Sequence, residues 1–191
     1  MSLFLVMDYF EKNLLKWSEE FHDITSSNDA IPQMLDVAEK IISGLLLVHA
    51  KGYLHMDLKP ANILLRIRDG KVEDVVLADF GSARELTEGE AGQNEGLCGT
   101  HPYNICPDTH YTQKYDIWGL GIVFYHMVAC ITGRSAVSCT DLVKVIKDAK
   151  QGKLEEKLDG FDENLRDLIL HCFTPDLEQR PCSKDLYTFI L

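Results

Sequence analysis

His55-Met56-Asp57-Leu58-Lys59-Pro60-Ala61-Asn62 and Asp79-Phe80-Gly81 are the two motifs that say most about the fold of this chain. Asp57 and Asn62 are five residues apart, a spacing that lets one loop present a carboxylate outward and an amide back toward a cleft. Asp57 and Asp79 are 22 residues apart, which leaves room for a hairpin that brings the second carboxylate to face the first. Either motif alone indicates no more than a turn, but the two in this order, together with Lys59, indicate one site.

This pattern resembles the catalytic loop (HRDLKxxN) and the metal-binding turn (DFG) of eukaryotic-type Ser/Thr protein kinases. Phosphoryl transfer needs a carboxylate near the attacking hydroxyl, oxygen ligands for magnesium and positive charge beside the γ-phosphate. The resemblance assigns the carboxylate to Asp57 and the positive charge to Lys59, and it assigns the magnesium ligands to Asn62 and Asp79. It implies a transferase that uses ATP and Mg²⁺ and phosphorylates Ser or Thr hydroxyls of a protein substrate.

Later segments extend the resemblance over nearly the whole chain. Gly99-Thr100-His101-Pro102-Tyr103 resembles the substrate-docking turn of the family, in which Thr100 would hydrogen-bond Asp57 and Lys59 and favour Ser or Thr acceptors. Thr100 is therefore expected to belong to the catalytic site.

Cys106-Pro107-Asp108 stands where most kinases have Ala-Pro-Glu. The acidic residue of the family pairs with a buried arginine, and Arg180 in Gln179-Arg180-Pro181 is the matching partner, so we expect an Asp108–Arg180 ion pair. Phosphotransferases of the antibiotic and choline type also carry His-x-Asp with a following Asn, but these two motifs and Lys59-Pro60 favour the protein kinases.

Other assignments follow from the same resemblance. Asp116 would hold the backbone of the catalytic loop. Leu64 would form the floor of the adenine site and Phe10 would provide a hinge backbone contact. Val123 and Met127 have helical spacing, and the sequence alone indicates that they are core residues. The resemblance implies that they also pack beneath the adenine site and support it.

The pattern predicts a mainly α (α+β) fold that resembles the C-terminal lobe of a protein kinase, a helical bundle with short β-hairpins at the catalytic cleft. Ile63-Leu64-Leu65 and Val75-Val76-Leu77 are expected to pair across a turn at Asp69-Gly70. Helices are expected over 14–21, from Pro32 to Lys51-Gly52, from Asp116 to about Cys130, and over 141–150, 163–173 and 183–190.

The resemblance divides the chain into two parts, a last strand of the N-terminal lobe with the hinge, and the C-terminal lobe. The first part covers 1–13, with a strand at Leu3–Met7 and an irregular polar stretch at Asp8–Asn13, and the second covers 14–191. The second part contains the catalytic loop (55–62), the metal turn (79–81) and the activation segment (79–108).

Composition excludes several other classes. A net charge of −11 makes a non-specific nucleic-acid binder a poor interpretation, because such binding relies on clustered Lys and Arg. The apolar run Ile117–Ile131 is too short to span a membrane. The six cysteines form no CxxC pair and are expected to be free thiols, which places the protein in the cytosol (cytoplasmic).

Two departures from the family pattern limit the expected activity. Met56 stands in place of an arginine that pairs with a phosphorylated activation loop, so control by loop phosphorylation is not expected. The glycine-rich loop and strand lysine of a kinase N-terminal lobe are absent from the sequence, because Leu3–Phe10 already resembles the last strand of that lobe and the hinge. We therefore expect little or no kinase activity from this polypeptide alone.

Two functions thus remain open at the level of sequence. The first is a Ser/Thr protein kinase whose N-terminal lobe is missing or is supplied by a partner chain. The second is a non-catalytic, kinase-like binding module that engages a partner protein. The amphipathic stretch Asp141–Lys150 could also dock a partner, although a helix face that covers the core is the favoured interpretation.

Overall fold

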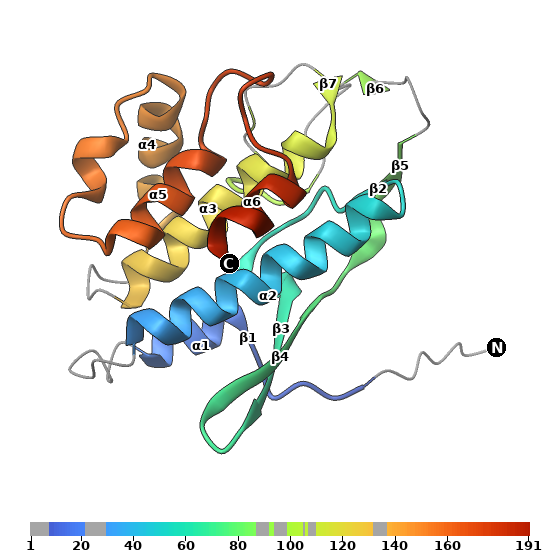
Figure 1. The fold of residues 1–191 in the computed structure, drawn as a ribbon, viewed down its shortest axis with the longest axis vertical. Coiled ribbons are helices and arrows are strands. Elements are labelled where there is room, and N and C mark those ends of the chain that lie inside the picture. Colours follow the sequence, from blue (N-terminus) through green and yellow to red (C-terminus); the bar gives the residue numbers. More distant parts are fainter. Residues whose placement is uncertain are drawn as a thin grey trace.

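The computed structural model describes residues 8–21, 30–86, 92–93, 99–104, 106, 110–131 and 137–191. Within these ranges the molecule is a bundle of helices from which one long β-hairpin extends (Figure 1). The expected strand Leu3–Met7, and Asp108, which was expected to pair with Arg180, lie outside the described residues.

The helices occupy the segments that hydrophobic periodicity predicts. They are α1 (Leu14–Phe21), α2 (Ala30–Ala50), α3 (Gln113–Ile131), α4 (Cys139–Lys150), α5 (Glu163–Cys172) and α6 (Ser183–Ile190). Short 3-10 turns cover Pro60–Asn62, Phe80–Ser82 and Glu155–Leu158.

Helix α3 forms the centre of the core. Every residue from Tyr115 to Ile131 is buried, as expected for a helix that is apolar on all sides and has other elements packed around it. Helices α1 and α5 make the most extensive contacts with α3, while α2 packs against α6 and against the hairpin (Figure 1). Val123 and Met127 are fully buried within α3, which confirms that they are core residues.

The hairpin joins β3 (Ile63–Arg68) to β4 (Lys71–Leu77) in antiparallel register. Its turn residues Asp69 and Gly70 both have positive φ, of 51° and 76°, which matches the turn type that closes two-residue hairpins. The expected pairing across Asp69-Gly70 is therefore confirmed, with strands longer than the apolar runs that predicted them.

A third short strand differs from expectation. β1 (Lys12–Asn13) pairs with Leu65 and Leu64 of β3, so the sheet order is β1-β3-β4, whereas the sequence predicted an irregular stretch there. Two polar residues carry no β-type pattern, and their pairing depends on β3, which lies far along the chain. The remaining strands form two small sheets, β2 (Tyr53–Leu54) with β5 (Arg84–Glu85) and β6 (Gly92–Gln93) with β7 (His110–Tyr111).

β4 lies at one edge of the three-stranded sheet. The Val75 N–H donates to the carboxylate of the neighbouring Asp74 at 2.9 Å. Near the hairpin tip, Glu73 of the same strand forms an ion pair with Arg68 at 2.9 Å. Acidic side chains therefore stand along this edge.

Helix α3 begins three residues before Asp116, where the sequence predicted its start. The Thr112 hydroxyl accepts from the Lys114 N–H at 3.2 Å, which is the interaction of an N-cap residue. Thr112 thus marks the start of α3. The apolar pattern did not reveal this start, because the next residues, Gln113 and Lys114, are polar.

Candidate active site

The backbone of the catalytic loop is fixed by Asp116, at the start of α3. Its buried carboxylate accepts from the N–H groups of His55, at 2.8 Å, and Met56, at 2.9 Å. The expected role of Asp116 is therefore confirmed. Two adjacent amides held by one carboxylate leave the loop little freedom, so the side chains that follow it are presented from a rigid base.

A second layer of hydrogen bonds stands behind Asp116, and sequence analysis did not find it. His49 of α2 lies 2.9 Å from the Asp116 carboxylate through Nε2, and its Nδ1 lies 3.0 Å from the Ser183 hydroxyl of α6. All three side chains are buried. His49 lies on the apolar stripe of α2. A histidine at such a position is the one sequence feature that could have indicated a buried hydrogen-bond partner.

Asp57 and Lys59 form the centre of the site. Lys59 Nζ donates to Asp57 Oδ2 at 2.8 Å and to Thr100 Oγ1 at 2.7 Å, so it bridges the catalytic loop and the following segment. Asn62 Nδ2 donates to the same Asp57 oxygen at 3.0 Å and to the Asp57 carbonyl at 2.9 Å. Four of the predicted residues thus meet in one network.

The other Asp57 carboxylate oxygen, Oδ1, is buried and has no hydrogen-bond partner within the described residues. Burial would raise the pKa of this carboxyl group, but hydrogen bonds from Lys59 and Thr100 and the charge of Lys59 outweigh it and hold the pKa below its usual value. Asp57 is therefore an ionised acceptor at neutral pH, and no donor from the described residues reaches its Oδ1.

The catalytic loop and the metal turn are joined directly. The Ala78 N–H donates to the Asn62 carbonyl at 2.8 Å, and His55 Nε2 lies 3.0 Å from the Ala78 carbonyl. The ring of Phe80 packs against that of His55, with centroids 4.9 Å apart. Asp79 lies between these two contacts, so the chain brings it to the catalytic loop.

Asn62 and Asp79 suit the ligands of a magnesium ion. The Asn62 amide nitrogen is used toward Asp57, which turns the amide oxygen away from that carboxylate. Asp79 is exposed, has a left-handed φ of 63°, and accepts a long hydrogen bond from the Gly81 N–H, at 3.4 Å. One amide oxygen and one carboxylate match the way proteins hold Mg²⁺, which usually takes its other ligands from phosphate and water.

Gly99 allows the segment with Thr100 to approach the catalytic loop. Its φ is +82°, and a Cβ built at this position would lie 2.4 Å from the Met56 carbonyl oxygen and 3.2 Å from Asp57 Oδ1. Any larger residue would push Thr100 away from Lys59, so glycine is required here for steric and conformational reasons.

Met56 has a structural role where the kinase pattern has arginine. Its φ is 66°, and its side chain is buried in an apolar cluster with Leu54, Tyr111 and Tyr115. Packing explains the methionine, and no charge is available at this position.

Leu64 and Phe10 lie at the three-stranded sheet. Leu64 is half-buried and alternates with the fully buried Ile63 and Leu65, so it belongs to the opposite face of β3. Arg66 follows on the same face as Leu64, and its guanidinium lies 4.9 Å from the centre of the Phe10 ring. Leu64, predicted as the floor of the adenine site, and Phe10, predicted as a hinge contact, therefore lie toward the same face of the sheet.

Tyr103 anchors the segment after Thr100 to α3. Its hydroxyl lies 2.8 Å from His126 Nδ1; His126 is buried and Tyr103 is partly buried. Burial raises the pKa of Tyr103 and lowers the pKa of His126 to about 4. The Tyr103 hydroxyl therefore donates to a neutral His126 imidazole.

The low pKa of His126 predicts a pH dependence of stability. An unfolded histidine has a pKa near 6.5, so between about pH 6.5 and 4 the unfolded chain binds a proton that the folded protein excludes. The free energy of unfolding should therefore fall as the pH drops through this window, by up to about 3 kcal/mol. Urea denaturation at several pH values measures it, and His126→Gln, which keeps an acceptor for Tyr103, should lose this part of the slope. An unchanged slope in the variant would contradict the prediction.

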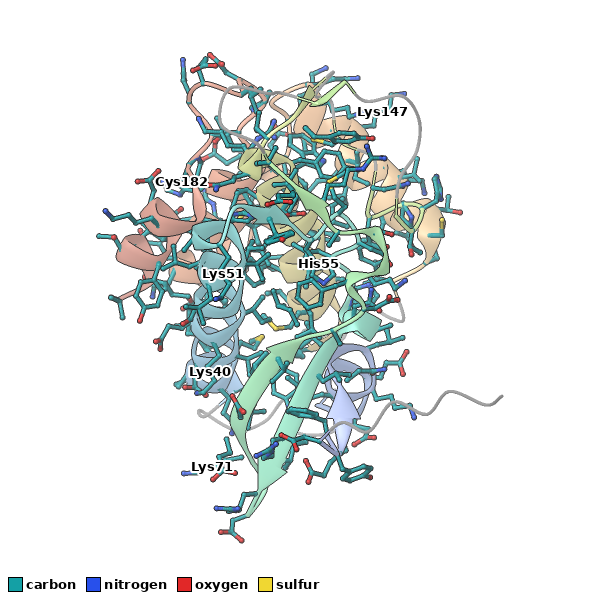
Figure 2. All side chains as sticks on the ribbon, turned by 90° about the vertical axis from the view of Figure 1, so that its right-hand side faces the viewer. Lys40, Lys51, His55, Lys71, Lys147 and Cys182 are labelled. Carbon is teal, nitrogen blue, oxygen red and sulfur yellow. The ribbon has the colours of Figure 1, made fainter. Side chains whose placement is uncertain are left out.

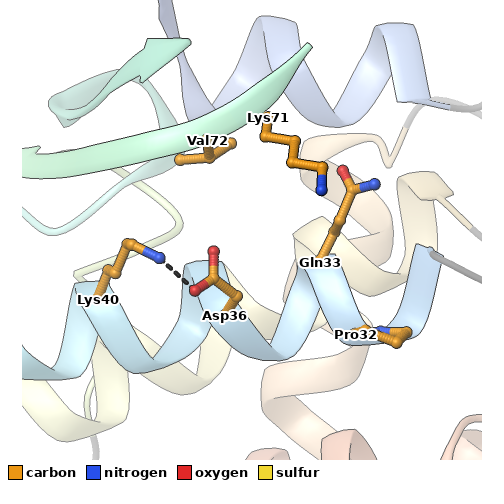
Figure 3. Close-up of a pocket in the computed structure, with 6 residues that line it drawn as sticks. All are labelled: Pro32, Gln33, Asp36, Lys40, Lys71 and Val72. Atoms are coloured by element: carbon orange, nitrogen blue, oxygen red, sulfur yellow. Dashed lines mark hydrogen bonds and ion pairs between the residues drawn. The ribbon is translucent and has the colours of Figure 1, made fainter. Parts of the chain in front are cut away.

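A pocket of about 440 Å³ lies between the first turns of α2 and the start of β4 (Figure 3). It is lined by Pro32, Gln33, Asp36, Lys40, Lys71 and Val72, and Lys40 is paired with Asp36. None of these residues belongs to the network around Asp57, so this pocket is separate from the candidate active site.

Comparison with known proteins agrees with this geometry. The profile of the protein kinase domain family matches residues 1–188. The chain therefore belongs to the protein kinase domain family, and its relatives make it a domain of the eukaryotic Ser/Thr type.

Three of these relatives show how far the similarity extends. Serine/threonine-protein kinase pakG of Dictyostelium discoideum is 28% identical over 98% of this chain, and pak-2 of Caenorhabditis elegans is 29% identical over 96%. Human Serine/threonine-protein kinase ULK1 is 34% identical over 70% of this chain. The matched regions cover only 15%, 34% and 13% of pakG, pak-2 and ULK1 respectively.

Proposed function

We propose that this chain is the C-terminal-lobe part of a Ser/Thr protein kinase and transfers the γ-phosphate of ATP to Ser or Thr hydroxyls of protein substrates. The observation that carries the proposal is the Asp57 carboxylate. One of its oxygens is held by Lys59 and Asn62, while the other is buried and unpaired within the described residues. A buried carboxylate oxygen without a donor is suited to receive the hydroxyl of an incoming substrate.

Each residue of the network has a role in this reaction. Asp57, ionised at neutral pH because its pKa is lowered, orients the attacking hydroxyl and accepts its proton. Lys59 keeps Asp57 in place and adds positive charge where the transferred phosphoryl group becomes more negative. Thr100, bound to Lys59, positions the segment that would carry the substrate.

Asn62 and Asp79 would hold magnesium, which neutralises triphosphate charge and so eases transfer when it is bound. Leu64 would contact the adenine ring from the sheet and Phe10 would lie at the hinge. The partial exposure of Leu64 and the contact of Phe10 with Arg66 on the same face of β3 support both assignments.

We further propose that phosphate transfer by this chain alone is slow. A partner chain or a further segment would then cover the catalytic site on the side where a kinase N-terminal lobe lies. A pocket of about 530 Å³ supports this proposal. It is lined by Leu47, Val48, Lys51, Tyr53, Phe80 and Ala83, and Phe80, next to the metal ligand Asp79, is 47% exposed. An exposed apolar surface beside the metal turn is suited to a covering element.

The same pocket favours the second candidate function, a non-catalytic module that engages a partner protein through this surface. For either function we propose a cytosolic location, supported by free thiols at Cys130, Cys139, Cys172 and Cys182. No helix in the described residues is long and apolar enough to cross a membrane.

Nucleotide binding and transfer, measured separately, test the proposed function. Millimolar ATP with Mg²⁺ should raise the melting temperature of the full chain, because a ligand that binds only the folded state stabilises it. Asp79→Ala should abolish the increase. Asp57→Asn should keep the increase but reduce phosphate transfer to a Ser/Thr peptide to background.

Two results would count against catalysis. Absence of any thermal shift at millimolar nucleotide would favour the binding module. Equal transfer by the parent chain and Asp57→Asn would show that the phosphorylation comes from a contaminating kinase.

A further inference from the structure

Helix α4 has one face that the core does not use. Its buried residues are Leu142, Val145, Ile146 and Ala149, which pack toward the rest of the bundle. Val143, Lys147 and Lys150 follow the spacing i, i+4, i+7, so they form a single stripe on the outer side. The stripe begins with an apolar residue and continues with two cations.

This stripe lines a shallow groove of about 320 Å³ at the C-terminal end of α4. The groove is formed by Val143, Ile146, Lys147, Lys150 and Gln151. Val143 is 38% exposed and supplies apolar surface, while the two lysines supply charge. The groove therefore combines an apolar floor with positively charged sides.

The positive charge of the groove is not neutralised by the acidic residues of α4. Asp141 pairs with Lys144 at 3.8 Å, and Asp148 pairs with Lys157. Within the described part of the chain, Lys147 and Lys150 make no ion pair. Lysines in a last turn complement the helix dipole, but the dipole does not explain why an apolar Val143 is exposed one turn earlier on the same stripe.

We propose that this groove of α4 docks an acidic peptide segment of a partner protein, with one apolar side chain of the segment on Val143 and acidic groups at Lys147 and Lys150. Charge complementarity carries the choice of occupant. The whole chain has a net charge of −11, so a cationic apolar groove is a local exception that selects for an anionic partner. The proposal goes beyond phosphoryl transfer, since no residue of the groove belongs to the site around Asp57.

A protein segment fits the groove better than a membrane does. Recognition of anionic lipid normally involves clusters of four to eight Lys or Arg, and this groove presents two. The overall negative charge of the chain would also oppose its approach to an anionic lipid surface.

Fluorescence anisotropy with the full 191-residue chain tests the proposal. The probe is a short fluorescein-labelled peptide of glutamate residues around one central leucine. Lys147→Glu/Lys150→Glu should weaken its binding about tenfold or more, because attraction becomes repulsion at both positions. Val143→Ser should weaken binding severalfold, as should a probe with serine in place of leucine.

The matched control is Lys16→Glu/Lys71→Glu, which changes the net charge by the same amount at two exposed positions outside the groove. Figure 2 shows Lys71 at the opposite end of the molecule from Lys147, and Lys16 belongs to helix α1. The control should change the dissociation constant by less than about twofold. Because charge reversal near a helix end could weaken the fold, Lys147→Gln/Lys150→Gln is compared as well, and melting curves show that each variant is folded.

Three outcomes would overturn the proposal. The probe could fail to bind at millimolar concentration. Both double reversals could weaken binding equally, which would mean that only net charge matters. Vesicles of phosphatidylserine and phosphatidylcholine could bind the chain through Lys147 and Lys150 while the peptide does not, which would identify a membrane surface.

Discussion

Replacement of Asp116 by alanine is expected to lower the free energy of unfolding by about 3 to 5 kcal/mol. The carboxylate accepts from the N–H groups of His55 and Met56 and lies 2.9 Å from His49 Nε2. Its removal leaves these buried donors without an acceptor in a place that water does not reach. Urea denaturation measures the loss, and amide hydrogen exchange at His55 and Met56 should accelerate at the same time.

The control for this variant is Glu156→Ala, which removes an exposed carboxylate from the turn Glu155–Leu158. Its effect should lie within about 0.5 kcal/mol, as is usual for a surface position. Asp116→Asn should fall between the two, because the amide retains one acceptor oxygen but not the charge. A loss below about 1 kcal/mol for Asp116→Ala would show that the loop does not depend on this residue.

Arg180→Ala is expected to be comparably damaging, with a loss of about 3 to 5 kcal/mol. The side chain is 1% exposed. Its guanidinium donates to the carbonyls of Thr174, at 2.8 Å, and Lys114, at 3.0 Å, and lies 4.8 Å from the centre of the Trp118 ring. It thereby joins the start of α3 to the loop after α5, and alanine would leave both a cavity and unpaired carbonyls.

Two further variants separate the causes at this position. Arg180→Lys keeps the charge but not the planar group that stacks on Trp118 and reaches two carbonyls, so it should rescue little. Arg180→Met restores most of the volume without a buried charge and should recover part of the loss. Full recovery by lysine, measured by urea denaturation, would contradict the assigned geometry.

Much of this fold was predictable because its signals are local. The apolar runs on each side of Asp69-Gly70 predicted the hairpin. Helices α1 and α6 have the bounds that periodicity predicted, 14–21 and 183–190. The proximity of Asp57 and Lys59 was also predictable, because they are only two positions apart in one loop.

The parts that were missed depend on contacts distant in sequence. His49 and Ser183 are 134 residues apart, and no local pattern connects them. Lys12 and Asn13 become a strand only because β3 lies beside them. Burial of Met56 depends on Tyr111 and Tyr115, which belong to another part of the chain. The sequence shows a methionine at this position, but it does not reveal that the side chain is buried in an apolar cluster.

The long hairpin of β3 and β4 stands out from the helical body (Figure 1), and an outer strand of this kind is where cross-β fibrils can grow. Asp74 occupies the Val75 amide that a newly added strand would use, and Glu73 adds a second acidic group nearby. Pairing of two hairpins along this strand would first have to displace the Asp74 carboxylate from the Val75 N–H.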